Sequence, residues 1–93
     1  MSNPKVTKRL GHDNMSMVIK FQSGATLDWK IGRGGEKLAI AFSNNKEEVK
    51  QQIKIVEKFL KGRKSEDNKA RFLRLEETVK GCRSGKEFIA KIS

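Results

Sequence analysis

Residues 15–42 read MSMVIKFQSGATLDWKIGRGGEKLAIAF, and this stretch decides the fold. Large apolar side chains recur at every second position in three runs, with mostly polar or small residues between them, and the runs are separated by the glycine-containing segments 22–24 and 32–35. A period of two is typical of strands with one buried face, and short glycine-containing connections join antiparallel neighbours. The stretch therefore predicts a three-stranded antiparallel meander, which becomes four-stranded if residues 6–10 add an edge strand.

After residue 42 the apolar period becomes helical. A first helix is expected over about 45–61, with a cap at Asn44 and an end at Gly62. Its apolar stripe consists of Val49, Ile53, Val56 and Leu60. A second helix is expected from Ser65 to the glycine at position 81, and a short third helix from Ser84.

Strands followed by helices predict an α+β domain in which two to three C-terminal helices cover one face of the sheet. The chain has 93 residues, one proline and no visible repeat, so a single domain over 1–93 is expected. Within it, 1–13 form a partly flexible N-terminal segment or edge strand, 14–42 the meander and 43–93 the helices. The apolar side of the strands, including Trp29, is expected to face the helices.

The charge of the chain favours a polyanionic partner. Lysine and arginine number 21 against 11 acidic residues, which gives a net charge of +10, spread over the whole chain. Such an excess opposes compaction and is typically used to attract phosphate-bearing polymers. We therefore expect a non-enzymatic protein that binds DNA or RNA, with no cofactor and no metal.

The candidate nucleic-acid contacts are ten basic residues. They are Lys20, Lys30 and Lys37 on the polar side of the strands, Arg33 in the glycine-rich loop, Lys50, Lys54, Lys58 and Lys61 on a helical ridge, and Arg63 and Lys64 after it. The ridge is equally compatible with a solvated helix face in which Glu47 and Glu57 pair with Lys50 and Lys61. The loop is equally compatible with a plain strand connection.

Aromatic residues help to choose the ligand. The chain has no tyrosine, and its strand aromatics share the side assigned to the core, so base stacking is not favoured. Contact with the backbone of structured or double-stranded nucleic acid is expected instead. Trp29 leaves two alternatives open: its side chain is part of the core, or it stacks on a base or a partner beside Lys30 and Arg33.

Catalytic chemistry finds little support in the sequence. The single histidine, His12, lies beside Asp13 in a polar loop, without a patterned nucleophile. A metal-dependent nuclease using Asp13, Asp28 and Lys30 is the sharper enzymatic alternative. The single cysteine, Cys82, allows no internal disulfide and is expected to be buried.

A second hypothesis is a protein-binding inhibitor or adaptor that docks on an acidic surface of a larger complex, as a small viral or phage factor would. Leu73 and the Val18, Ala39 and Ala41 strip would then form the interface. A homodimer that completes the thin core is also expected. No apolar leader or membrane-length apolar run is present, which together with one cysteine predicts a cytoplasmic protein without a membrane partner.

Overall fold

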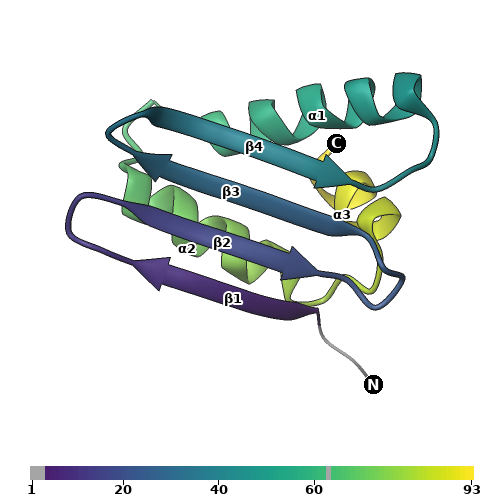
Figure 1. Ribbon diagram of the computed structural model, residues 1–93, viewed down its shortest axis with the longest axis horizontal. Helices are drawn as coiled ribbons and strands as arrows, with labels where there is room; N and C mark the ends of the chain where they lie inside the picture. The colour runs from purple at the N-terminus through teal and green to yellow at the C-terminus, as the bar shows by residue number, and fades with distance from the viewer. Residues whose placement is uncertain (1–3, 63) are drawn as a thin grey trace.

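The computed structural model describes residues 4–62 and 64–93. This part of the chain forms a four-stranded antiparallel sheet in the order β1-β2-β3-β4, followed by three helices (Figure 1). The elements are β1 Lys5–Leu10, β2 Met15–Lys20, β3 Thr26–Gly32, β4 Gly35–Ala41, α1 Lys46–Lys61, α2 Asn68–Val79 and α3 Gly85–Ile92. The predicted α+β fold is confirmed, and β1 supplies the fourth, edge strand.

The strand register assigns each side chain to a face of the sheet. Trp29 lies directly opposite Met17 on β2 and Leu38 on β4, and this face is covered by the helices. The next residue, Asp28, lies opposite Val18 and Ala39 and points to the other face. Figure 1 shows the helices on one side of the sheet, with α2 behind the strands and α1 running beside β4. The second face, here called the open face, is covered by none of the described helices.

The core fills the space between sheet and helices. Its largest fully buried side chains are Trp29, Phe72, Phe88, Met17, Ile19, Leu27, Leu60, Leu75, Val56 and Val79. Each such residue stabilises the fold by about 1.5–3 kcal/mol relative to an exposed side chain. The expected apolar face is therefore the one that the helices cover.

Trp29 belongs to this core and is not available for stacking. Its exposed fraction is 0%, and its indole Nε1 donates a hydrogen bond to Glu36 Oε1 on β4 at 2.9 Å. Arg71 of α2 pairs with the same carboxylate and lies 5.4 Å from the indole ring centroid. This cluster ties β3 and β4 to α2 and fixes which face of the sheet is buried.

The helix caps differ slightly from the prediction. Asn45, not Asn44, caps α1, because its side chain accepts hydrogen bonds from the backbone N–H groups of Glu47 and Glu48. Asp67, not Ser65, caps α2 by accepting from the N–H of Ala70. Asp67 offers a charged acceptor at the start of the helix, and its negative charge also interacts favourably with the positive end of the helix dipole.

Other predicted features of the helices are the cap of α3 and the ion pairs on α1. Ser84 caps α3 as expected. Lys50 lies 3.7 Å from Glu47, but the expected pairing of Glu57 with Lys61 is not found among residues 4–62 and 64–93. No helix in those ranges is long and apolar enough to cross a membrane.

Candidate nucleic-acid interface

The open face gathers basic residues from all four strands. Alternation along each strand directs toward it the side chains of Lys5 and Arg9 on β1, Lys20 on β2, Lys30 on β3 and Lys37 on β4. The sequence prediction included Lys20, Lys30 and Lys37 but missed Lys5 and Arg9. The alternation in residues 5–10 could have revealed them, since Lys5, Thr7 and Arg9 stand on one side of that strand.

Two lysine pairs stand directly opposite each other across neighbouring strands. Lys5 pairs in register with Lys20, and Lys30 with Lys37. Ser16 on β2 lies opposite both Lys30 on β3 and Arg9 on β1. Arg9, Ser16, Lys30 and Lys37 therefore form one row that crosses the four strands. Four residues along the strands separate this row from the Lys5 and Lys20 row, a distance of about 13 Å. The cations therefore occupy two rows near opposite ends of the face.

The electrostatics of the open face are unbalanced. Within the described residues, Asp28 is the sole carboxylate among its side chains, so five cations and one anion leave a net charge of +4. None of the five takes part in any ion pair that the described chain makes within 4.0 Å. Like charges directly opposite each other in a sheet are destabilising. An anion bound between them would relieve that repulsion.

One end of the open face is hollowed. A cavity of about 340 Å³ is lined by Arg9, Lys30 and Lys37, together with polar and glycine positions. The other lining residues are Asn14, Met15, Ser16, Gly32, Gly34 and Gly35. No carboxylate is among these lining residues. Three cations and exposed glycine backbone without a competing acid are suited to a phosphate group.

The turn between β3 and β4 shapes this hollow. Gly35 has φ 99°, a conformation that side chains with a Cβ rarely adopt. A Cβ added to Gly34 would meet no atom within 4 Å, so the backbone there is open to a ligand. Arg33 lies exposed in the same turn but does not line the hollow.

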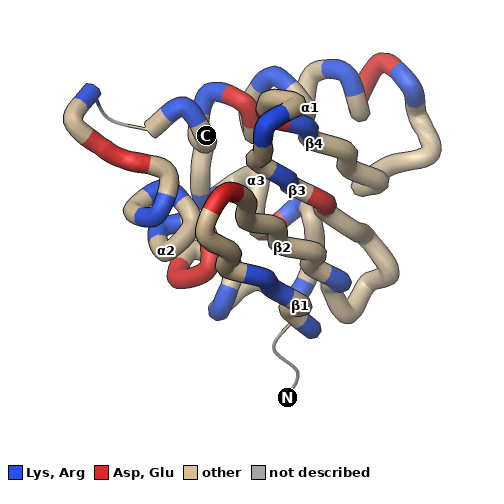
Figure 2. Tube along the Cα trace, turned by 60° about the vertical axis from the view of Figure 1, so that its left-hand side comes forward, with Lys and Arg blue, Asp and Glu red and all other residues tan. Residues whose placement is uncertain are grey.

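The remaining candidate residues lie on another surface. Gln52, Val56 and Leu60 form the buried side of α1, and the exposed lysines stand away from it. These exposed lysines are Lys46, Lys50, Lys54, Lys58 and Lys61. Figure 2 shows basic positions both along α1 and on the strands. Lys64 is exposed after α1, and Arg63 lies outside the described residues. The nine candidates that the structure describes thus divide into three on the open face, Arg33 in the β3–β4 turn, and five on or just after α1.

Glu47 and Glu57 lie among the lysines of α1, which also carries Glu48. Glu47 lies next to Lys50, and Glu57 is exposed near the C-terminal end of the helix. Lys58 and Lys61 lie in the last turn, where cations interact favourably with the helix dipole. The α1 ridge therefore has structural roles for its charge that the open face lacks.

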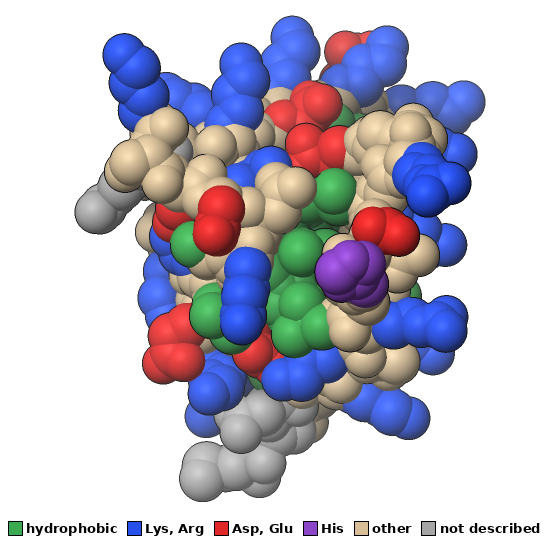
Figure 3. All heavy atoms as spheres, turned by 90° about the vertical axis from the view of Figure 1, so that its left-hand side faces the viewer, with side chains coloured by type: hydrophobic (Ala, Val, Ile, Leu, Met, Phe, Trp, Pro, Cys, Tyr) green, Lys and Arg blue, Asp and Glu red, His purple; other side chains and the backbone are tan. Residues whose placement is uncertain are grey.

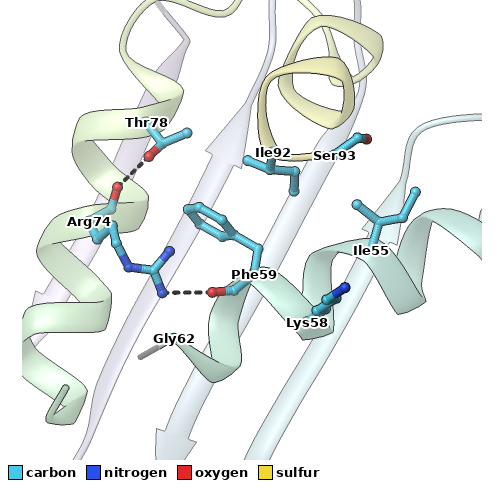
Figure 4. Close-up of a pocket in the computed structure, with 8 residues that line it drawn as sticks. All are labelled: Ile55, Lys58, Phe59, Gly62, Arg74, Thr78, Ile92 and Ser93. Atoms are coloured by element: carbon cyan, nitrogen blue, oxygen red, sulfur yellow. Dashed lines mark hydrogen bonds between the residues drawn. The ribbon is translucent and has the colours of Figure 1, made fainter. Parts of the chain in front are cut away.

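A larger hollow lies in the helical layer, away from the open face. It has a volume of about 670 Å³, and Figure 4 shows Ile55, Phe59 and Ile92 on its walls. The Arg74 guanidinium lies 4.2 Å from the Phe59 ring centroid, donates to the Phe59 carbonyl oxygen and pairs with Glu66. Its charge is committed to holding α1 against α2, which leaves Lys58 as the other cation in the lining.

The carboxylates proposed for a nuclease do not come together. Asp13 lies in the β1–β2 loop and Asp28 in the middle of β3, which the register separates by about 15 Å. The structure groups no three His, Cys, Asp or Glu side chains of residues 4–62 and 64–93 as a metal site requires. His12 is exposed. A shared metal site for Asp13 and Asp28 is therefore not supported.

Cys82 is buried as expected, with an exposed fraction of 3%. Its thiol donates to the Thr78 carbonyl oxygen at 3.5 Å. Burial raises the pKa of this thiol, the Lys91 ammonium lowers it, and Glu87 raises it. A protonated, buried thiol is a packing residue and not a nucleophile at neutral pH.

The exposed apolar residues lie where β1 meets α2. Among the described residues, the large hydrophobic side chains that are exposed are Leu10, with an exposed fraction of 50%, and Leu73, with 49%. The Lys8 ammonium on β1 pairs with the Glu76 carboxylate on α2. Leu10 lies two residues after Lys8 on β1, and Leu73 lies one turn before Glu76 on α2, so both leucines lie near this ion pair. Figure 3 shows the end of the molecule at which the β1–β2 loop lies, where an apolar area is bordered by both basic and acidic side chains.

Comparison with known proteins adds no family to this description: no protein-family model, curated protein or solved structure matches the chain.

Proposed function

We propose that this chain is a small, non-enzymatic nucleic-acid-binding protein that holds the phosphate backbone of DNA or RNA on the open face of its sheet. Its main support is the pair of opposed lysine pairs, Lys5 with Lys20 and Lys30 with Lys37. Their mutual repulsion costs stability in the free protein and is relieved by a bound phosphate chain. The strand register holds the Cα atoms of each pair directly opposite each other.

The backbone, rather than stacked bases, supplies the affinity in this proposal. All six aromatic side chains of the sequence belong to the core or pack against it. Affinity on a face without aromatic residues depends on phosphate contacts, which structured and double-stranded nucleic acids present as well as single strands. A reducing, cytoplasmic compartment fits the single buried thiol of Cys82.

The same charge distribution bears on dimerisation. Two open faces, each with a net charge of +4, repel each other, so a homodimer would have to form through another surface. The exposed Leu10 and Leu73 are better placed for such a contact.

A salt series of mobility-shift assays over single- and double-stranded DNA and RNA tests the proposal. The decisive variant replaces Lys20, Lys30 and Lys37 with Glu, and a matched variant replaces Lys50, Lys54 and Lys58 with Glu. Both change the charge by the same amount. We expect binding to fall steeply with salt, the open-face variant to lose it, and the α1 variant to retain most of it.

Two results would contradict this placement. Loss of binding in the α1 variant alone would move the interface to α1. Failure of the natural chain to retard any nucleic acid at low salt would overturn the function itself.

A protein partner with an acidic surface is the second candidate, and the exposure of Leu10 and Leu73 favours it. Apolar residues at the centre of a polar and charged rim are typical of a protein interface. In that case Leu10→Ser and Leu73→Ser would abolish partner binding, whereas nucleic-acid binding through the open face would be unaffected by them.

A further inference from the structure

Asp28 differs from every other polar side chain of the open face. It is half-buried in the middle of β3, and its cross-strand neighbours are the apolar Val18 and Ala39. Its Oδ1 is shielded from solvent and accepts no hydrogen bond from the described part of the chain. None of the ion pairs there involves it. An unpaired buried carboxylate oxygen costs stability, and a hydrogen-bond donor that reaches the carboxylate from the hollow that Asp28 lines would offset part of that cost.

Two adjoining hollows share the Lys30 and Lys37 side chains. On one side lies the cavity described above, which also contains Arg9 and has no acid in its lining. On the other side lies a hollow of about 470 Å³ that is lined by Asp28, Lys30, Lys37, Leu38 and Ala39. Asp28 lies two residues from Lys30 on β3, or about 7 Å along the strand. A nucleotide spans a comparable distance from its phosphate to the edge of its base.

We propose that Asp28 accepts a hydrogen bond from the amino group of an unpaired base whose phosphate lies in the neighbouring cationic hollow. This inference rests on the proposed function and adds a base preference to it. Cytosine, adenine and guanine present amino donors on their pairing edge, whereas thymine and uracil present one imide N–H between two carbonyl oxygens. Those oxygens repel a carboxylate. The open face therefore selects against thymine and uracil.

The position of Asp28 explains why the base must be unpaired. Its side chain is recessed in a broad sheet, and the grooves of a duplex admit a helix or a two-stranded ribbon but not a four-stranded face. A loop, bulge or single-stranded end can lay a base on that face, while its neighbouring phosphates contact the lysine pairs.

Competing occupants fit the site less well. A second copy of the chain would bring another face of net charge +4 against this one. A metal ion would find a single carboxylate, because the described residues contain no group of three potential ligands. A base amino group supplies a donor without adding charge.

The test compares the affinities for oligo(dC) and oligo(dT) of equal length at low salt, near pH 8, where cytosine is neutral. The natural chain should bind oligo(dC) on the order of tenfold more tightly. In Asp28→Asn, the affinity for oligo(dT) should rise because a negative charge is lost, and the ratio should approach one. Glu77→Gln, the same charge change at an exposed α2 residue, should leave the ratio as it is.

A modified ligand tests the natural protein directly. Oligo(dC) with N4,N4-dimethylated bases has no amino hydrogens, so the natural chain should bind it about as weakly as oligo(dT). Equal affinity for the two unmodified oligomers, or an unchanged ratio in Asp28→Asn, would refute the role of Asp28 while leaving backbone binding intact. Absence of any binding would instead refute the proposed function as well.

Discussion

The Lys5 and Lys20 pair lets stability and binding be separated in one experiment. Lys20→Glu places a carboxylate directly opposite Lys5 and turns a like-charged pair into an oppositely charged one. Cross-strand pairs of opposite charge contribute roughly 0.2–1 kcal/mol, and like charges are unfavourable. We therefore expect the free energy of unfolding to rise by about 0.5–1 kcal/mol. For a domain of this size the melting temperature should rise by roughly 2–8 °C.

The same substitution should weaken nucleic-acid binding. On the proposed interface it removes one phosphate contact, so the slope of log affinity against log salt should fall by about 0.9 on B-DNA or 0.7 on single strands. A stabilised protein that binds less well is the expected result, because under the proposed function the lysine pair favours ligand binding and disfavours folding.

Urea unfolding followed by the fluorescence of Trp29, the single tryptophan, measures the first effect. Lys5→Glu should give a similar gain, whereas the double variant, with Glu opposite Glu, should lose it. This cycle isolates the pair from effects of net charge. Destabilisation by both single variants, or a double variant equal to the sum of the singles, would contradict the β1–β2 register or its energetic role.

Two further predictions concern packing and pH. At Gly85 an added Cβ would lie 2.7 Å from the Phe42 ring, so Gly85→Ala should lower the free energy of unfolding by about 1–3 kcal/mol. At Gly34 an added Cβ would meet open space, so Gly34→Ala should change that free energy by less than about 0.5 kcal/mol. Urea unfolding measures both changes. Burial raises the pKa of the Cys82 thiol above its value in the unfolded chain. The contribution of Cys82 to the free energy of unfolding is therefore complete below the pKa of the unfolded state and is lost as the pH rises through the pKa of the folded state. The stability difference between the natural chain and Cys82→Ala should therefore shrink in alkaline urea titrations, and a constant difference would contradict a raised pKa.

The sheet was predictable because alternation in residues 15–42 is almost unbroken. The edge strand was harder, since Lys8 falls on the inner face among apolar neighbours and weakens the pattern. In the structure its ammonium pairs with Glu76 of α2, 68 positions away in the chain. A local pattern cannot reveal a charge that is satisfied by so distant a residue.

The role of Trp29 was open for a similar reason. Basic residues follow it in the sequence, which is typical of a base-stacking platform. Its indole is instead held by Glu36 and Arg71, which reach it from β4 and α2. The side on which a strand residue is buried depends on where the helices pack, and a sequence shows only that two sides alternate.

The choice between the two cationic surfaces depends on register, which periodicity does not reveal. Lysines on α1 follow one another at helical spacing, with Glu47 and Glu57 among them. Lys30 and Lys37 have no carboxylate in their cross-strand row, and hydrogen-bonded strands hold their Cα atoms opposite each other. Charge held in opposition and without a nearby counterion has the greater free energy to gain from a phosphate. The open face is for that reason the stronger candidate, although α1 carries as many lysines as that face has cations.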